Sequence, residues 1–366
     1  SAYNEEVDKI STMKKRSLRE VRQVVDTNPR KISWNLDLFE QAARNKKGKF
    51  SEDIRVSLYR PFTKTYQYWD WLFNQRLHLF PQIFPTPHHS NLVIAVTGRG
   101  ATKPFSALVS DKVVDLEMIS KGQCFPLYWY EHPDNNKSKK KKMSLPMDKV
   151  DNVDDYGYIR HDAISDWALS AFKEHYSDWS ITKESIFWYV YALLHSDDYR
   201  DRFQNNLRRG LPRIPFVSDF WAFSNAGSEL AYWHLNYESV EPYPLEEIVR
   251  EGRERDTRVE KMRFAGKRFT PDKTTIVVNE TLTLTGIPLE AYEYQVNGKS
   301  PVEWVMERYQ VSTDKKSGIV TDPNLYSEDP EYIVNLVKRL VRVSLETRRI
   351  IEELPEMVIS EETAFS

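Results

Sequence analysis

The chain has 366 residues and a formal net charge of −2 at pH 7, with 52 Lys and Arg against 54 Asp and Glu. Its 17 Phe, 20 Tyr and 10 Trp against 12 Gly exclude disordered and low-complexity classes, because large rings bury much apolar surface. The length predicts two or three packed units. The near-zero charge argues against a polycation, so any nucleic-acid surface must be a local patch.

The compartment follows from cysteine usage and from the first residues. Cys124 is the one cysteine, which excludes an internal disulfide and a thiolate metal cluster and favours a reducing, cytoplasmic setting. Residues 1–20 alternate charged and apolar residues, unlike a signal peptide. No stretch approaches the ~18 apolar residues of a membrane span, so we expect no membrane partner. The chain opens inside a helical pattern, and we expect it to be a fragment of a longer polypeptide.

The first half changes from helical to strand-like patterning. Apolar residues recur at helical spacing over 4–26 and 35–44, which predicts that 1–50 is a helical connector. Residues 51–150 are predicted to be strand-rich. The expected strands are 55–62, 64–69, 91–97, 105–109 and 113–118.

The second half begins with a helical block over 151–245, continues with a second strand-containing part over 246–326, and ends in a C-terminal helix and tail over 327–366. The predicted helices are 164–175, 186–194, 197–209, 218–233, 300–310 and 330–353. Residues 274–278 and 281–285 are a hairpin candidate. The fold class is therefore α+β, with a strand-rich recognition portion, a helical block and a long C-terminal helix.

A glycine-bearing turn, TGRGATKP over 97–104, follows a predicted strand as phosphate-binding loops do. It matches neither the P-loop nor the Rossmann spacing, so it is a poor nucleotide site. Its backbone N–H groups, with Arg99 and Lys103, could instead contact nucleic-acid phosphates. A strand-ending turn with solvated charges explains the same residues.

Catalytic and metal-binding patterns are sparse. His88 and His89 are adjacent and would point to opposite faces of a strand, and the other histidines lack ligand spacing. A Ser nucleophile elbow and a carboxylate nuclease pattern are also missing from the sequence. We therefore expect no catalytic centre, no metal and no cofactor in this segment.

Two basic segments remain. The lysine tract 137–142 predicts a solvated, mobile loop, with a DNA arm as the alternative. Residues 250–273 hold nine basic and five acidic residues, a local net charge of +4, interleaved with Phe264 and Phe269. A charged helix with compensating ion pairs is favoured over 250–260, and nucleic-acid binding over 261–273. The candidate DNA-binding residues are Arg99, Lys103, Lys261, Arg263, Lys267, Arg268 and Lys273.

Six stretches carry a family resemblance. They are DTNPRKISW (26–34), SLYRPFTK (57–64), KPFSAL (103–108), GQCFP (122–126), LPRIPF (211–216) and AYEYQVNGKS (291–300). Together they resemble the C-terminal specificity region of type ISP restriction–modification enzymes, which join nuclease, helicase-like ATPase, adenine-N6 methyltransferase and target-recognition parts in one polypeptide. The YRPF signature also resembles the boundary where adenine methyltransferases pass into their recognition domain.

The resemblance implies a module of bacterial defence that recognises a double-stranded DNA sequence, with residues 51–150 as the first part of its target recognition domain. It would position DNA for adenine-N6 methylation and for ATP-dependent translocation and cleavage by upstream methyltransferase and helicase domains. The sequence lacks the Asn-Pro-Pro-Tyr catalytic motif. S-adenosylmethionine, ATP and Mg²⁺ are thus expected in the parent enzyme only. The alternatives are a protein–protein scaffold that docks those domains and a free-standing DNA enzyme with an unrecognised site.

Overall fold

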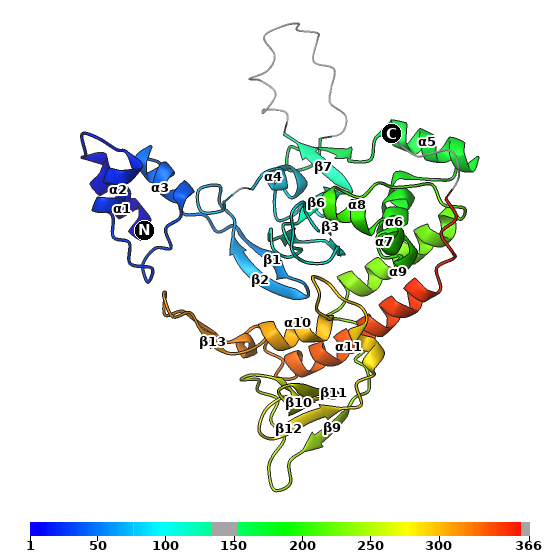
Figure 1. The fold of residues 1–366 in the computed structure, drawn as a ribbon. Helices are drawn as coiled ribbons and strands as arrows, with labels where there is room; N and C mark the ends of the chain where they lie inside the picture. The colour runs from blue at the N-terminus through cyan, green and yellow to red at the C-terminus, as the bar shows by residue number, and fades with distance from the viewer. Residues whose placement is uncertain (76, 133–152, 360–366) are drawn as a thin grey trace, which may run out of the picture.

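The computed structural model describes residues 1–75, 77–132 and 153–359, in which helices and several small sheets are segregated along the chain (Figure 1). This arrangement confirms the α+β prediction and its long C-terminal helix. Buried apolar side chains form three clusters, among the N-terminal helices, beneath the C-terminal sheet and within the helical block. The lysine tract 137–142 lies outside the described residues.

The N-terminal region contains three short helices around a small core of their own. They are α1 (Ala2–Ser11), α2 (Leu18–Val24) and α3 (Leu36–Ala43). The helix predicted over 35–44 is confirmed, but the single helix over 4–26 is wrong. Ser17 explains the break, because its hydroxyl accepts the Glu20 N–H while the Glu20 carboxylate accepts the Ser17 N–H. Such a capping box starts a new helix.

The strand-rich part consists of three small sheets and a short helix. Its elements are β1 (Ile54–Arg60), β2 (Thr63–Tyr68), α4 (Phe80–Ile83), β3 (Val93–Val96), β4 (Ala107–Ser110), β5 (Val113–Val114), β6 (Gln123–Pro126), β7 (Tyr128–Glu131) and β8 (Ile159–Asp162). The sheet orders are β2-β1-β5, β4-β3-β6 and β7-β8, and only the β1–β5 pair among them is parallel. The strand predicted over 113–118 is too long, because the Asp115 carboxylate accepts the Glu117 N–H and turns the chain.

The helical block packs around α6, which is apolar on nearly all sides as its sequence predicts. Its helices are α5 (Asp166–Tyr176), α6 (Lys183–Leu193), α7 (Asp197–Arg202), α8 (Gln204–Arg209) and α9 (Phe220–Leu235). The helix predicted over 197–209 is interrupted at Phe203, and the other three predicted helices of the block are confirmed. Helices α6 and α9 lie so close that a Cβ atom on Gly227 would stand 1.9 Å from the Trp188 carbonyl oxygen.

The last part contains a four-stranded antiparallel sheet in the order β10-β11-β12-β9. Its elements are β9 (Glu246–Val249), β10 (Arg263–Lys267), β11 (Thr270–Val277), β12 (Leu282–Thr285), η2 (Leu289–Tyr292), α10 (Pro301–Arg308), β13 (Ser312–Thr313), β14 (Val320–Thr321), η3 (Pro323–Leu325) and α11 (Tyr332–Glu352). The hairpin predicted around residues 279–280 is confirmed, as are the helices over 300–310 and 330–353.

Helix α11 connects two of the three cores. Its first half, with Ile333, Leu336 and Leu340, packs into the cluster beneath the C-terminal sheet. Its second half, with Ile350 and Ile351, belongs to the cluster of the helical block. Figure 1 shows α11 (red-orange) running from the sheet β9–β12 to α9. No helix in the described part of the chain combines the length and the hydropathy needed to cross a bilayer.

A buried chain of hydrogen bonds also joins these layers. The Val109 N–H donates to the Tyr191 hydroxyl (3.1 Å), which lies 2.6 Å from His234 Nδ1. His234 Nε2 lies 2.9 Å from Thr347 Oγ1, and that hydroxyl donates to the Val343 carbonyl at 2.7 Å. Thr347 therefore accepts from Nε2–H, and Nδ1 accepts from Tyr191, so the geometry requires a neutral imidazole.

We expect Gly227→Ala to lower the free energy of unfolding by about 3 kcal/mol, because α6 and α9 must separate to admit the methyl group. Urea denaturation of the chain measures this change. The matched control is Gly210→Ala, where the nearest atom would be 3.9 Å away and the backbone is extended. The control should leave stability unchanged or raise it by about 0.5 kcal/mol. Equal effects of the two substitutions would contradict the close packing.

We expect stability to fall as the pH drops below about 6.5. Burial, and then the positive charge of Arg200, lower the pKa of His234 to about 3, and burial also holds the pKa of His195 well below its usual range. The unfolded chain therefore binds protons first, so the stabilisation is complete above pH 6.5 and is lost toward pH 3. Between these pH values, each imidazole lowers the free energy of unfolding by about 1.4 kcal/mol for every pH unit of acidification. Urea midpoints at pH 7.0 and 5.5 should differ less for His234→Gln than for the unsubstituted chain.

Candidate nucleic-acid interface

The β10–β11 hairpin presents the basic residues predicted over 261–273. Lys267 pairs with Thr270, so Arg268 and Phe269 form a two-residue turn at its tip. Gly266 has φ +79°, and a Cβ there would lie 2.9 Å from the Thr270 carbonyl oxygen, so this position requires glycine. The turn therefore projects both of its side chains, and both are exposed.

Four of the predicted cations are open to solvent on this hairpin or just before it. Lys261, Arg263, Lys267 and Arg268 are exposed, and within the described residues none of them forms an ion pair with a carboxylate. The single acid of the segment, Asp272, accepts hydrogen bonds from the Thr274 hydroxyl (2.6 Å) and N–H (2.9 Å). Those bonds lower the pKa of Asp272. The hairpin thus carries unpaired positive charge on a nearly neutral chain, with Lys267 and Arg268 at its tip and Arg263 at its open end.

Lys273 differs from the other four. Its ammonium lies 3.0 Å from Glu303 Oε1, and 4.9 and 5.8 Å from the ring centres of Tyr292 and Phe264. The Tyr292 hydroxyl also donates to the Lys273 carbonyl at 2.7 Å. Lys273 therefore attaches the base of the hairpin to α10 and η2, and its charge has a partner within the chain.

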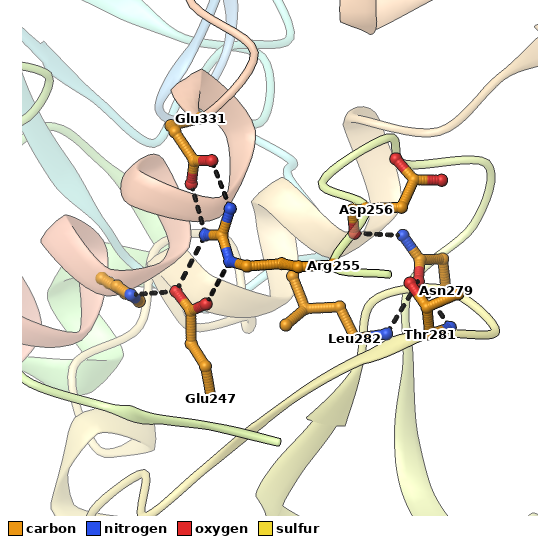
Figure 2. A network of polar contacts seen from close by, with 8 residues as sticks. Glu247, Arg255, Asp256, Asn279, Thr281, Leu282 and Glu331 are labelled. Atoms are coloured by element: carbon orange, nitrogen blue, oxygen red, sulfur yellow. Dashed lines mark hydrogen bonds and ion pairs between the residues drawn. The ribbon is translucent and has the colours of Figure 1, made fainter. Parts of the chain in front are cut away.

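Two arginines of the preceding segment, residues 250–260, form ion pairs within the folded chain. The Arg255 guanidinium lies between Glu247, whose Oε2 is 2.7 Å from Nε, and Glu331, whose Oε1 is 2.5 Å from Nη1 (Figure 2). Lys338 Nζ lies 2.6 Å from Glu247 as well. Hydrogen bonds from Arg255 lower the pKa of Glu247 to about 2. Arg258 pairs in the same way with Asp322 and Glu260, which confirms the predicted compensating pairs.

The helix predicted over 250–260 is wrong, because a distant side chain binds the backbone there. The Asn279 amide donates to the carbonyls of Asp256 and Arg258, both at 2.8 Å. Its Oδ1 accepts the N–H groups of Thr281 and Leu282, also at 2.8 Å (Figure 2). The segment is therefore an extended loop attached to the β11–β12 turn.

The glycine-bearing turn 97–104 packs against and hydrogen-bonds to residues 120 and 121. A Cβ on Gly98 would stand 1.8 Å from the Lys121 carbonyl oxygen, and the Gly98 N–H donates to Ser120 at 3.1 Å. Lys121 Nζ in turn donates to the Gly100 carbonyl at 2.8 Å. Arg99 and Lys103 are both exposed on this turn. The sequence prediction of a tight turn with accessible cations fits the geometry.

Asn297 joins two of the stretches that carried the family resemblance, 291–300 and 103–108, and also binds the backbone of residues 118 and 120. Its backbone N–H donates to Ser106 Oγ (2.9 Å), its amide donates to the Met118 carbonyl (3.0 Å), and its Oδ1 accepts the Ser120 N–H (3.0 Å). Asn297 has φ +56° and Gly298 φ +77°, so the NG pair makes a tight turn. The predicted cations therefore lie on two separate segments, the β10–β11 hairpin with Lys261 and the turn that carries Arg99 and Lys103. Helix α10 contacts both β2 and η2.

A groove that the sequence did not predict lies on the strand-rich part. It is open, has a volume of about 1690 Å³, and is bounded by β2, β5, β6 and residues 73–75 and 77–83. Six large apolar side chains that line it are at least partly exposed: Tyr59, Tyr66, Phe73, Leu79, Leu116 and Phe125. The sequence carried no clear signal for this groove, because its lining residues come from separate segments. Six exposed apolar side chains around one groove form a larger apolar patch than singly scattered surface residues do.

Catalytic and metal chemistry finds little support in the geometry. No group of three or more His, Cys, Asp or Glu in the described residues is arranged to hold a metal ion. Burial raises the pKa of Cys124 to about 12, so its thiol is protonated at neutral pH and is a poor nucleophile.

Comparisons with known proteins identify the family of this chain. A family model described as the type ISP C-terminal specificity domain matches residues 1–336. A nuclease-deletion mutant of the type ISP restriction–modification enzyme LlaGI, solved with a DNA substrate mimic, is 35% identical over 98% of this chain, with a TM-score of 0.80. DNA-bound LlaBIII, an ATP-dependent type ISP enzyme, is 30% identical over 98% of this chain (TM-score 0.81).

A DrdV–DNA complex is 31% identical over 98% of this chain, with a TM-score of 0.80. The chain spans 25%, 21% and 33% of the LlaGI, LlaBIII and DrdV chains respectively. A comparison with curated proteins found no match. The family model and the three structures agree, and they confirm the resemblance carried by the six sequence stretches: the chain belongs to the type ISP C-terminal specificity domain family.

Proposed function

We propose that this chain recognises a sequence in double-stranded DNA as the target-recognition part of a single-polypeptide restriction–modification enzyme. It positions that DNA for adenine-N6 methylation and for ATP-dependent translocation and cleavage by other domains of the polypeptide. S-adenosylmethionine, ATP and Mg²⁺ bind to those other domains. The enzyme acts in the cytoplasm, where its DNA and its cofactors are found.

The β10–β11 hairpin is the observation that carries this proposal. Three exposed cations on the hairpin, Arg263, Lys267 and Arg268, and Lys261 just before it lack carboxylate partners among the described residues, and Lys273 fixes the strand pair to the rest of the chain. A two-stranded ribbon fits the major groove, which is about 12 Å wide, and Lys and Arg bind phosphates or guanine edges there. The relatives that cover 98% of this chain were solved with DNA or with a DNA mimic.

Arg99 and Lys103 supply a second DNA contact in this proposal. Their turn is fixed by Gly98, Lys121 and Asn297, so the two cations have a defined position at little entropic cost. A contact at a rigid turn suits phosphate binding, which sets the register of a protein on duplex DNA.

The groove favours a second function, the docking of a neighbouring domain of the same polypeptide. Its exposed rings, such as Tyr59, Tyr66 and Phe125, are the residue types enriched in protein–protein interfaces. The charged residues that line it are mostly acidic, with Asp115 and Glu117 beside Lys121, which disfavours phosphates. DNA reading and domain docking thus fall on different surfaces.

We expect the double variant Arg263→Ala/Lys267→Ala to bind duplex DNA more weakly and with a smaller salt dependence. Each lost phosphate contact should reduce the slope of log K against log salt concentration by about 0.9. Fluorescence anisotropy with a random-sequence duplex at several salt concentrations measures both quantities. Arg208→Ala/Arg209→Ala, which removes two exposed cations of α8, is the matched control. Indistinguishable slopes for the two variants would refute the hairpin assignment.

Replacing both Arg99 and Lys103 by alanine should also lower the affinity and the salt slope while leaving the selected DNA sequence unchanged. Selection of bound duplexes from a random pool, followed by sequencing, measures the preference directly. A relaxed preference at one base pair would instead identify one of the two side chains as a base reader. Unaltered affinity, slope and preference would remove this turn from the interface.

A further inference from the structure

Phe269 is an unusual residue for the tip of a basic hairpin. Its side chain is 89% exposed, and the two residues before it, Lys267 and Arg268, are both cationic. The Arg268 guanidinium lies 5.6 Å from the centre of its ring. The ring gains nothing from burial in the folded chain, so it is available for contact with another molecule.

The hairpin holds this ring on a rigid support. At its base Phe264 packs against the core beneath the sheet, and Lys273 is fixed by Glu303 and Tyr292. At its tip Gly266 adopts the positive φ that the narrow turn requires. Little conformational entropy is therefore lost when the tip enters a partner, which is the condition for a precise insertion.

The surroundings of Phe269 indicate the chemistry of that partner. A protein partner would favour a continuous apolar patch, as in the groove, whereas the neighbours of this ring along the hairpin are Lys267, Arg268, Thr270 and Pro271. An isolated ring that follows two cations matches flat aromatic faces that lie beside negative charges. Stacked base pairs flanked by phosphates have that arrangement.

We propose that Phe269 enters a groove of duplex DNA and stacks on the faces of the base pairs as a wedge, while Lys267 and Arg268 bind the phosphates on either side. This inference rests on the proposed DNA recognition and adds a contact whose strength does not depend on salt. A wedge that partly unstacks a base step also bends the duplex, and easily deformed steps are then preferred.

The test measures duplex binding by the 366-residue chain and by its Phe269→Ala, Phe269→Leu and Phe269→Trp variants over a range of salt. Phe269→Ala should weaken binding by about tenfold with an unchanged salt slope, because stacking releases no counterions. Trp should retain the affinity and Leu only part of it, since an aliphatic side chain can enter a base step but lacks the flat ring that stacks on the bases. The control is Trp179→Ala, which removes a 73% exposed ring that also lies near a cation, Lys173, on the helical block.

Photo-crosslinking gives an independent measurement. Random-sequence duplexes that contain 5-bromodeoxyuridine should crosslink to residue 269 of the unsubstituted chain, as mapped by mass spectrometry. Unchanged affinity of Phe269→Ala, full affinity of Phe269→Leu, or a reduced salt slope of Phe269→Ala would each overturn the wedge while leaving DNA recognition intact. Absence of duplex binding by the unsubstituted chain would overturn both proposals.

Discussion

The burial of α11 by two separate cores is the constraint on which the arrangement of this chain depends. Ile333, Leu336 and Leu340 are fully or nearly buried beneath the C-terminal sheet, and Ile350 and Ile351 are buried in the helical block. Each such side chain contributes about 1.5–3 kcal/mol when it leaves water. Because one continuous helix belongs to both cores, neither core can rotate without exposing part of it. The hairpin β10–β11 is thereby fixed relative to the helical block.

Polar contacts refine the position that this burial sets. Inside the helical block, Thr347 of α11 accepts a hydrogen bond from His234 of α9. At the other end of α11, Lys338 forms an ion pair with Glu247. Glu331, the residue just before α11, forms an ion pair with Arg255. The Arg255 side chain in these pairs is partly exposed, so the contacts orient the junction more than they stabilise it. The local net charge of 250–273 is uneven in the sequence itself, because residues 250–260 hold four basic and four acidic residues, whereas residues 261–273 hold five basic residues and one acid. The positive potential therefore concentrates on the hairpin and the residues just before it.

The sequence predicted what depends on local periodicity and missed what depends on distant partners. The apolar spacing of α11 and the turn around Asn279 were sufficient to identify a helix and a hairpin. The helix expected over 250–260 failed because the amide of Asn279, far along the chain, binds carbonyls that a helix would use itself. The groove escaped prediction for a similar reason. Tyr66, Leu116 and Phe125 lie on separate segments, and aromatic residues in a sequence indicate a core before they indicate a surface.

The hairpin and the groove rely on different forces, and this difference bears on how the proposed enzyme works. Phosphate contacts gain most of their free energy from released counterions, so the contribution of Lys267 and Arg268 falls as salt rises. Burial of Tyr59, Tyr66 and Phe125 against a neighbouring domain depends on apolar area and is nearly independent of salt. In the proposed enzyme, DNA is therefore released at high salt while the neighbouring domain stays bound. Since α10 lies between β2 and η2, at the base of the hairpin, a domain seated in the groove has a fixed orientation relative to the bound duplex.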